Sequence, residues 1–182
     1  MSTREKEIFI SKNSQEIIIQ SCEENFADAY IEFASQIAKE TKFTMQYEGK
    51  IISKEIIKDK WSKAKKSKTS ICLCCFDNDK MIGFLAMQSQ QPDHPWTKHI
   101  AEFGLMILKE YCGNGLGSRL LNIMEQEAKK MSIQRIEARA RTKNSAAIYF
   151  YLQNGYSIEG IRKNAAYIQE CFEDEYFLAK HI

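Results

Sequence analysis

Residues 111–118 form the most informative stretch of the chain, a glycine-rich turn that reads Tyr111-Cys112-Gly113-Asn114-Gly115-Leu116-Gly117-Ser118. An apolar run over 100–108 precedes the turn and predicts a strand, and an amphipathic helix follows over about 115–131. Glycines at alternate positions let the backbone approach a ligand closely, and the free N–H groups of the helix start then face that ligand. These donors and the helix dipole favour phosphate or pyrophosphate. The alternative is a turn that only joins strand to helix.

Two other phosphate-binding motifs match this turn less well. A P-loop requires Lys followed by Ser or Thr after its last glycine, and Ser118-Arg119 does not match. A dinucleotide fingerprint requires G-x-G-x-x-G, and counting from Gly113 its third glycine place holds Ser118. Glu137 does fall about 20 residues on, where a ribose-binding acid is expected. A Rossmann-type dinucleotide-binding protein is therefore disfavoured but stays open.

Strands and helices alternate outward from the turn over the whole chain. Apolar runs between turn signals predict strands over 16–20, 70–76, 81–87, 100–108, 134–140, 156–161 and 176–180. Helical spacing predicts helices over 25–39, 54–66, 115–131 and 145–153. In the helix over 54–66 the apolar residues Ile56, Ile57, Trp61 and Ala64 are expected to face inward. Because no linker or repeat interrupts the pattern, we expect one α/β (α+β) domain over residues 1–182.

Composition excludes several classes of protein. Of the 182 residues 44% are hydrophobic and 27% charged, the balance of a soluble globular chain rather than a disordered one. The net charge of +2 argues against a dedicated nucleic-acid binder. A polar start over Met1–Lys6, and the absence of any run of ~20 apolar residues, predict neither an export signal nor a membrane span. We therefore expect a cytoplasmic protein.

The cysteines support the same interpretation. Cys72, Cys74 and Cys75 crowd into one predicted strand, where neighbours point to opposite faces and suit neither mutual pairing nor a shared metal. A zinc site also lacks a second cluster, and the three histidines are not at ligand spacing. We expect no metal, and reduced, mostly buried thiols.

The turn resembles the acetyl-CoA motif of the GNAT superfamily of N-acetyltransferases, Gln/Arg-x-x-Gly-x-Gly/Ala, here Cys112 to Gly117. Residues 144–156, NSAAIYFYLQNGY, resemble the N-x-x-A-x-x-x-Y-x-x-x-G-F/Y block of that family. Residues 159–163 and 173–176 resemble the closing hairpin of the branch with ribosomal-protein and polyamine acetyltransferases. The resemblance covers about residues 16–180. It implies a mixed, mostly antiparallel sheet of about six to seven strands with helices on both faces.

The resemblance also implies an activity. It implies direct transfer of an acetyl group from acetyl-CoA, in a ternary complex, to a primary amine of a small molecule or of a peptide or protein N-terminus. It allows a homodimer. A non-catalytic acyl-CoA-binding or sensing module on the same fold is the alternative, and the Rossmann-type protein is a more distant one.

Site residues follow from the resemblance. Leu105, Met106 and Ile107 would pair with the pantetheine arm, with the backbone N–H of Ile107 polarising the thioester carbonyl, and residues 113–118 would hold the pyrophosphate. Asn144 would form a hydrogen bond with the pantetheine arm; the alternative is that it only caps a helix. Cys112 departs from the family's Gln or Arg; we interpret it as a tolerated substitution, although a thiol at a helix start can acquire a lowered pKa.

Tyr151 is the candidate general acid and Glu102 the candidate general base. Tyr151 follows Asn144 by about two helical turns, so both project from one face, and a phenol can protonate a departing thiolate. Tyr149 lies off that face, and the alternative for Tyr151 is a core aromatic. Glu102 lies on the strand that leads to the acetyl site, where several family members carry a catalytic glutamate. A simple surface role for Glu102, Glu137 as the base, or water alone stay open.

Overall fold

Eight strands form one sheet in the computed structural model, which describes residues 6–182. Residues 1–5, which open the polar segment interpreted above as lacking an export signal, lie outside the described part. In chain order the strands are β1 (Glu7–Ile10), β2 (Glu16–Ser21), β3 (Ser70–Asp77), β4 (Lys80–Ser89), β5 (Ile100–Ile107), β6 (Arg135–Arg141), β7 (Ser157–Ile168) and β8 (Cys171–His181). Their order across the sheet is β1-β2-β3-β4-β5-β6-β8-β7. The strand count exceeds the expected six to seven because β1 was not predicted.

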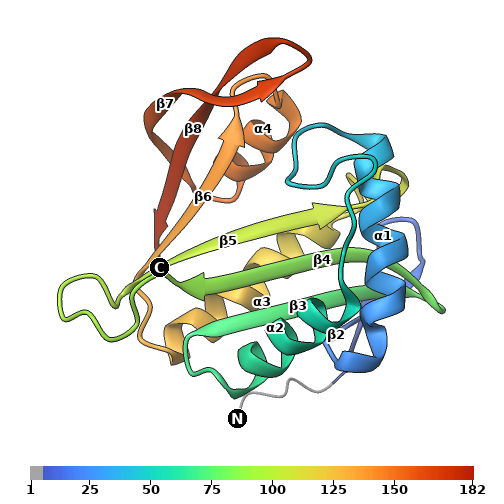
Figure 1. Cartoon of the computed structure of the whole chain (residues 1–182). Coiled ribbons are helices and arrows are strands. Elements are labelled where there is room, and N and C mark those ends of the chain that lie inside the picture. The colour runs from blue at the N-terminus through green and yellow to red at the C-terminus, as the bar shows by residue number, and fades with distance from the viewer. Residues whose placement is uncertain (1–5) are drawn as a thin grey trace.

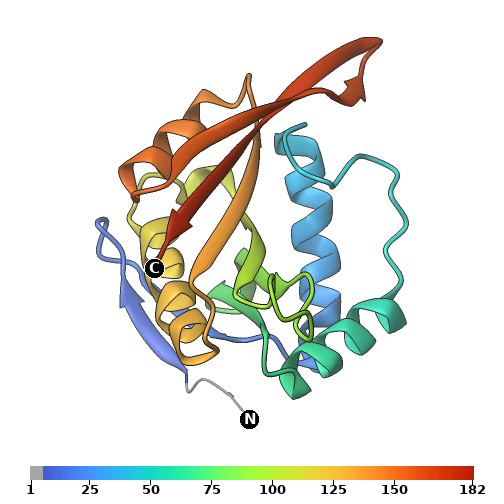
Figure 2. The same cartoon turned by 90° about the vertical axis from the view of Figure 1, so that its left-hand side faces the viewer.

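Helices cover both faces of the sheet, as predicted. They are α1 (Ala27–Glu40), α2 (Lys54–Lys66), α3 (Leu116–Lys130) and α4 (Ser145–Gln153), with single 3-10 turns at Glu24–Phe26 and Lys109–Tyr111. Figures 1 and 2 show α1 and α2 on one face and α3 and α4 on the other. The predicted inward position of Ile56 is wrong: it is 57% exposed, because Ile57 and Trp61 occupy the buried side of α2.

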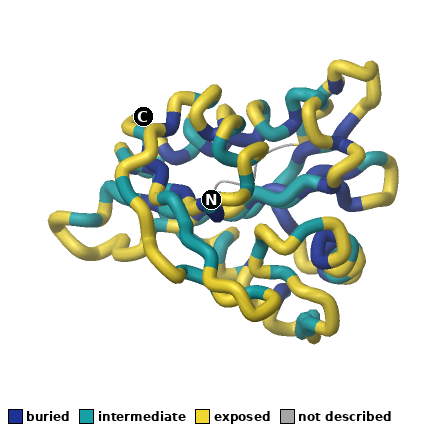
Figure 3. The backbone as a smooth tube through the Cα atoms, turned by 90° about the horizontal axis from the view of Figure 1, so that it is seen from above, coloured by how far each residue is buried: buried dark blue, intermediate teal, exposed yellow. Residues whose placement is uncertain are grey.

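The core lies on both faces of the central strands. Cys74 and Cys75 point to opposite faces of β3, and both are buried because helices cover each side. All six cysteines are free thiols, and Cys112 and Cys171 are exposed. Figure 3 shows buried residues concentrated in the middle of the sheet and exposed residues along the loops and the β7–β8 hairpin. Within residues 6–182, no helix combines the length and apolar character needed to cross a membrane.

One pair of neighbouring strands differs from the others in direction. β5 and β6 run parallel, whereas every other neighbouring pair of described strands is antiparallel. Their ladder covers only Ile100–Glu102 against Arg135–Glu137, after which the two strands diverge (Figure 1). A Rossmann-type protein needs a parallel, doubly wound sheet, so that alternative is wrong.

Candidate active site

The divergence of β5 and β6 opens a gap in the sheet, where within residues 6–182 no neighbouring strand pairs with the backbone on that side of β5. The Leu108 N–H donates to the Ile82 carbonyl of β4 at 3.0 Å, and the Gln134 N–H donates to the His99 carbonyl from the β6 side at 2.9 Å. Since backbone groups alternate between the two edges of a strand, odd-numbered residues of β5 present theirs to the gap. The N–H and C=O groups of Leu105 and Ile107 therefore face the gap, whereas those of Met106 bond to β4. An extended chain could pair there as an added strand.

The glycine-rich turn lies beyond the end of β5 and presents a row of N–H donors. Gly113 and Gly115 have positive φ angles of +79° and +89°, and Gly115 is the N-cap residue of α3. Within residues 6–182, the backbone N–H groups of 113–118 donate no hydrogen bond, while the Arg119 N–H begins the helical pattern by bonding the Gly115 carbonyl. The predicted anion site therefore has the backbone donors that it requires. Leu116 and Gly117 can contribute only backbone, since the Leu116 side chain is in the core.

The unpredicted strand β1 and the turn after it support this loop. The Lys12 N–H donates to the Asn114 carbonyl at 3.3 Å, and Arg119 Nε bonds Glu7 Oε1 at 2.7 Å. A Cβ atom on Gly115 would lie 3.6 Å from the Phe9 ring. The amino-terminal hairpin thus holds the turn from outside.

Gly117 also has a packing role, beside the backbone N–H that it offers to the turn. A Cβ atom at this position would lie 3.0 Å from two ring atoms of Phe150, so the glycine lets α3 and α4 approach each other closely. The third glycine of the motif therefore fixes the position of the helix that carries Asn144 and Tyr151.

Gly117→Ala is expected to lower the melting temperature, with a stability loss of about 1–3 kcal/mol from overpacking against Phe150. Thermal unfolding followed by circular dichroism measures this loss. Gly160→Ala is the control, because a Cβ atom there meets nothing within 4 Å. Equal stability of the two variants would contradict the packing role.

Cys112 stands at the start of the turn as a neutral thiol. Its Sγ lies 3.5 Å from the Leu108 carbonyl oxygen, to which it can donate. Burial, together with the nearby carboxylate of Glu40, raises the pKa of Cys112, which contradicts the suggestion that the helix start lowers it. The Cys112 thiol therefore contributes a hydrogen bond to the backbone just after β5, and it does not act as a thiolate.

Tyr151 lies on α4, as predicted, and Asn144 directly precedes the helix. Asn144 caps the helix, because its Oδ1 accepts a hydrogen bond from the Ala147 N–H at 3.2 Å, so the capping alternative is observed. Its side-chain NH₂ makes no hydrogen bond within residues 6–182 and can still donate to a ligand.

The Tyr151 ring is part of the core. It is 7% exposed and packs against Phe103 of β5, with ring centroids 5.8 Å apart, and against Tyr156. Burial raises the pKa of Tyr151 to about 12. Its hydroxyl forms no hydrogen bond within the described part of the chain. Tyr149, by contrast, is 66% exposed, so α4 separates the two tyrosines as the spacing predicted.

Glu102 lies at the closed end of the gap, at the last position of β5 that pairs with β6. Its Oε1 accepts from Arg139 Nε at 2.7 Å, and its Oε2 accepts from Gln90 Nε2 at 2.9 Å. Glu137, directly opposite on β6, accepts from Arg135 Nε at 2.8 Å. Both candidate bases are therefore hydrogen-bonded, and Glu102 must release or share a bond to accept a proton.

The hydrogen-bond partners of Glu102 were not predicted from the sequence. Arg139 and Gln90 reach Glu102 from another strand and from the β4–β5 loop, and nothing in the order of residues marks them. The sheet register that brings them together is a long-range property.

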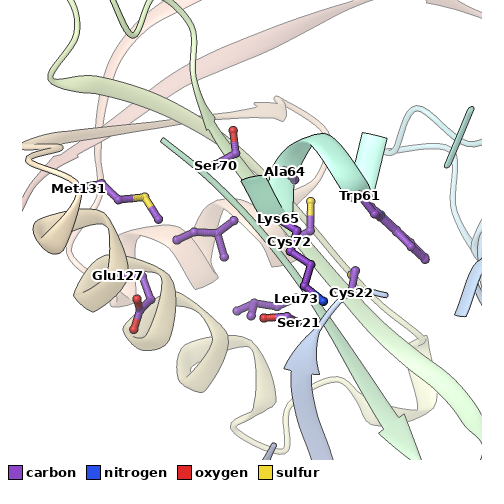
Figure 4. Close-up of a pocket in the computed structure, with 11 residues that line it drawn as sticks. Ser21, Cys22, Trp61, Ala64, Lys65, Ser70, Cys72, Leu73, Glu127 and Met131 are labelled. Carbon is purple, nitrogen blue, oxygen red and sulfur yellow. The ribbon is translucent and has the colours of Figure 1, made fainter. Parts of the chain in front are cut away.

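A small pocket of about 30 Å³ lies elsewhere, between α2, α3 and the start of β3 (Figure 4). Trp61, Cys22 and Cys72 line it, and it contains none of the predicted site residues. Its volume is close to that of one water molecule. Within residues 6–182, no group of His, Cys, Asp and Glu side chains is placed to hold a metal ion.

Comparison with known proteins connects this geometry to a family. The sequence model of the acetyltransferase (GNAT) family matches residues 26–156. The structure of an acetyltransferase of the GNAT family from Streptococcus pneumoniae superimposes with a TM-score of 0.85 at 31% identity, covering 92% of this chain and 100% of that one. The structure of yncA from Salmonella typhimurium with its cofactor acetyl-CoA shares the fold, with a TM-score of 0.77 at 15% identity, covering 91% and 93% of the two chains.

A curated relative extends the comparison to an activity. The L-amino acid N-acetyltransferase AaaT of Escherichia coli (strain K12) is 29% identical over 109 residues, which are 59% of this chain and 65% of that protein. The matched part thus spans somewhat less than two thirds of that relative. The diverging strands β5 and β6 and the glycine-rich turn lie within the residues that the family model matches, and on that match the chain belongs to the acetyltransferase (GNAT) family.

Proposed function

We propose that this acetyltransferase is a cytoplasmic enzyme that moves an acetyl group from acetyl-CoA to a primary amine by direct transfer in a ternary complex. The acceptor is a small molecule, such as an amino acid, or the amino terminus of a peptide or protein. The observation that carries the proposal is the gap between β5 and β6, whose unpaired backbone lies next to the free N–H groups of residues 113–118.

Leu105, Ile107 and the glycine-rich turn would hold acetyl-CoA. The backbone groups of Leu105 and Ile107 that face the gap would pair with the pantetheine arm, and the Ile107 N–H would polarise the thioester carbonyl. The N–H groups of 113–118 would bind the pyrophosphate. The free NH₂ of Asn144 would donate to the arm from α4. Met106, whose backbone bonds to β4, would contribute its side chain only.

Tyr151 would act as general acid. The acceptor nitrogen attacks the thioester carbon, the carbon–sulfur bond breaks, and the departing sulfur takes the proton of the Tyr151 hydroxyl. Burial keeps that hydroxyl protonated, since the pKa is raised to about 12. Glu102 would take the proton of the amine, with Arg139 stabilising its charge before the transfer.

The curated relative supports an amino acid as acceptor, since its name gives L-amino acids as the substrates of that protein. The charged side chains around Glu102 are also paired with one another. Arg139 pairs with Glu102, and Arg135 pairs with Glu137 and Glu159. Such paired charges favour a small zwitterionic acceptor over a highly charged polyamine.

Release of CoA thiol from acetyl-CoA, measured over a panel of amino acids, short peptides and polyamines, tests the proposal. We expect turnover with amino acids or peptide amino groups. Calorimetry with CoA accompanies the assay. Tight binding of acetyl-CoA with no turnover on any amine would instead favour the non-catalytic acyl-CoA-binding module.

Glu102→Gln is expected to reduce kcat/KM by about 10²-fold, because a general base contributes roughly that much. The variant keeps an oxygen acceptor for Arg139, so the side-chain contact between β5 and β6 is retained. Glu137→Gln, at the position directly opposite, is the comparison. A loss confined to Glu137→Gln would move the base to that residue, and full activity of both would assign deprotonation to water.

A further inference from the structure

The two strands that border the gap are tied, at their open ends, to one short segment that follows α1. Glu40 Oε2 accepts a hydrogen bond from the backbone N–H of Lys109, directly after β5, at 2.8 Å. The Lys42 carbonyl accepts a hydrogen bond from Arg141 Nη1, at the end of β6, at 2.9 Å. Residues 40–42 therefore connect the ends of β5 and β6 across the mouth of the gap. Figure 1 shows the end of α1 beside the arrowhead of β5.

On the β5 side, the connection is made by a residue of α1, a helix packed on the core. Glu40 is the last residue of α1, and its second oxygen, Oε1, accepts from Gln36 Nε2 one turn earlier at 2.9 Å. Helix α1 buries Phe33 and Ile37, among others, in the core. The carboxylate is thus oriented by its own helix toward the Lys109 N–H, although the contact itself is exposed to solvent.

The β6 side depends on a buried arginine. Arg141 is 7% exposed, and the carboxylates of Glu173 and Glu175 of β8 each approach its guanidinium to 3.8 Å, too far for a hydrogen bond. Its Nε has no hydrogen-bond partner in the described part of the chain. The carbonyl of Lys42 is accordingly the hydrogen-bond acceptor on which this buried charge depends.

A chain inserted between β5 and β6 needs a definite width. Strands in a sheet lie about 4.7–4.9 Å apart, so an arm that pairs with both must find roughly twice that separation. A misplacement of about 1 Å at a reacting group can reduce a rate by about 10²-fold. Because the sheet ladder itself ends at Glu102, other contacts must fix the width beyond that point.

We propose that residues 40–42 act as a brace that sets the width of the gap between β5 and β6, with Glu40 and Arg141 as positioning residues. The inference rests on the proposed function, since it concerns the gap assigned there to the pantetheine arm. Neither residue belongs to the sequence motifs of the turn or of α4. The brace also places the segment that follows α1 over the mouth of the gap, where the acceptor would enter.

Glu40→Ala and Glu40→Gln together test the brace. The alanine variant loses the acceptor for the Lys109 N–H, and we expect its Kd for CoA to rise about threefold to tenfold and its kcat to fall about tenfold. The glutamine variant keeps an oxygen in place and is expected to stay within about twofold of wild type. Glu32→Ala, on the exposed side of the same helix, is the control. Calorimetry with CoA gives Kd, and thiol release with the best acceptor gives kcat and KM.

Arg141→Lys tests the other end, because it retains the buried positive charge but cannot reproduce the guanidinium contact with Lys42. We expect a rise in the Kd for CoA like that of Glu40→Ala, measured alongside the melting temperature. Wild-type values for Glu40→Ala, or equal losses in Glu40→Ala and Glu40→Gln, would overturn the brace. Absence of turnover in the wild type would instead count against the proposed function, while the Kd for CoA would still test the brace.

Discussion

Tyr151→Phe is expected to lower kcat by about 10²-fold or more while leaving the KM for acetyl-CoA nearly unchanged, because general acids contribute about 10²–10⁴-fold. The substitution removes only the hydroxyl, and the ring keeps its packing against Phe103 and Tyr156. Since that hydroxyl forms no hydrogen bond within residues 6–182, the melting temperature should hardly change. Initial rates of thiol release with a saturating acceptor measure the effect.

The pH dependence and a matched control sharpen this prediction. An acid works in its protonated form, and burial raises the pKa of Tyr151 to about 12, so loss of its proton should not lower kcat at any pH up to about 10. Tyr149→Phe makes the same chemical change on an exposed side chain of the same helix and should retain full activity. Unchanged turnover in Tyr151→Phe would remove this residue from catalysis and leave it as a core aromatic.

Gly115→Ala is expected to raise the Kd for acetyl-CoA by at least about tenfold, which corresponds to about 1.4 kcal/mol. Gly115 has a φ of +89°, where an L side chain costs roughly 1–2 kcal/mol. Relief of this strain would rotate the N–H groups that follow it at the start of α3 away from the pyrophosphate. Calorimetry with acetyl-CoA and thermal unfolding measure the binding and stability effects separately.

Gly155→Ala is the control for backbone strain. Gly155 has a φ of +85° directly after the C-cap residue of α4, so it carries a similar conformational cost away from the turn. The two variants should lose similar stability, and only Gly115→Ala should lose affinity. Equal affinities would show that the backbone of the turn does not bind the phosphates.

Much of the fold could be predicted because its signals are local. Helix α2 begins and ends where its spacing predicted, with Ser53 as a cap that accepts from the Ile56 N–H. The helix predicted over 145–153 has the bounds of α4, and the capping alternative for Asn144 is observed. Strand β1 was missed because four residues carry too weak a pattern, and its ion pair to Arg119 spans 112 positions.

The sequence by itself determined which groups could bind and react: the glycines of the turn, the tyrosine and the asparagine of α4, and Glu102. Only the tertiary structure decided how these groups lie relative to one another and to their partners. It ended the β5–β6 ladder at Glu102, pointed the backbone of Ile107 but not of Met106 into the gap, and joined Glu102 to Arg139 and Glu40 to Lys109. The reason is physical: such contacts join residues far apart in the chain, 99 positions between Arg141 and Lys42 and 112 between Arg119 and Glu7, and they depend on strand register, which local preferences do not encode.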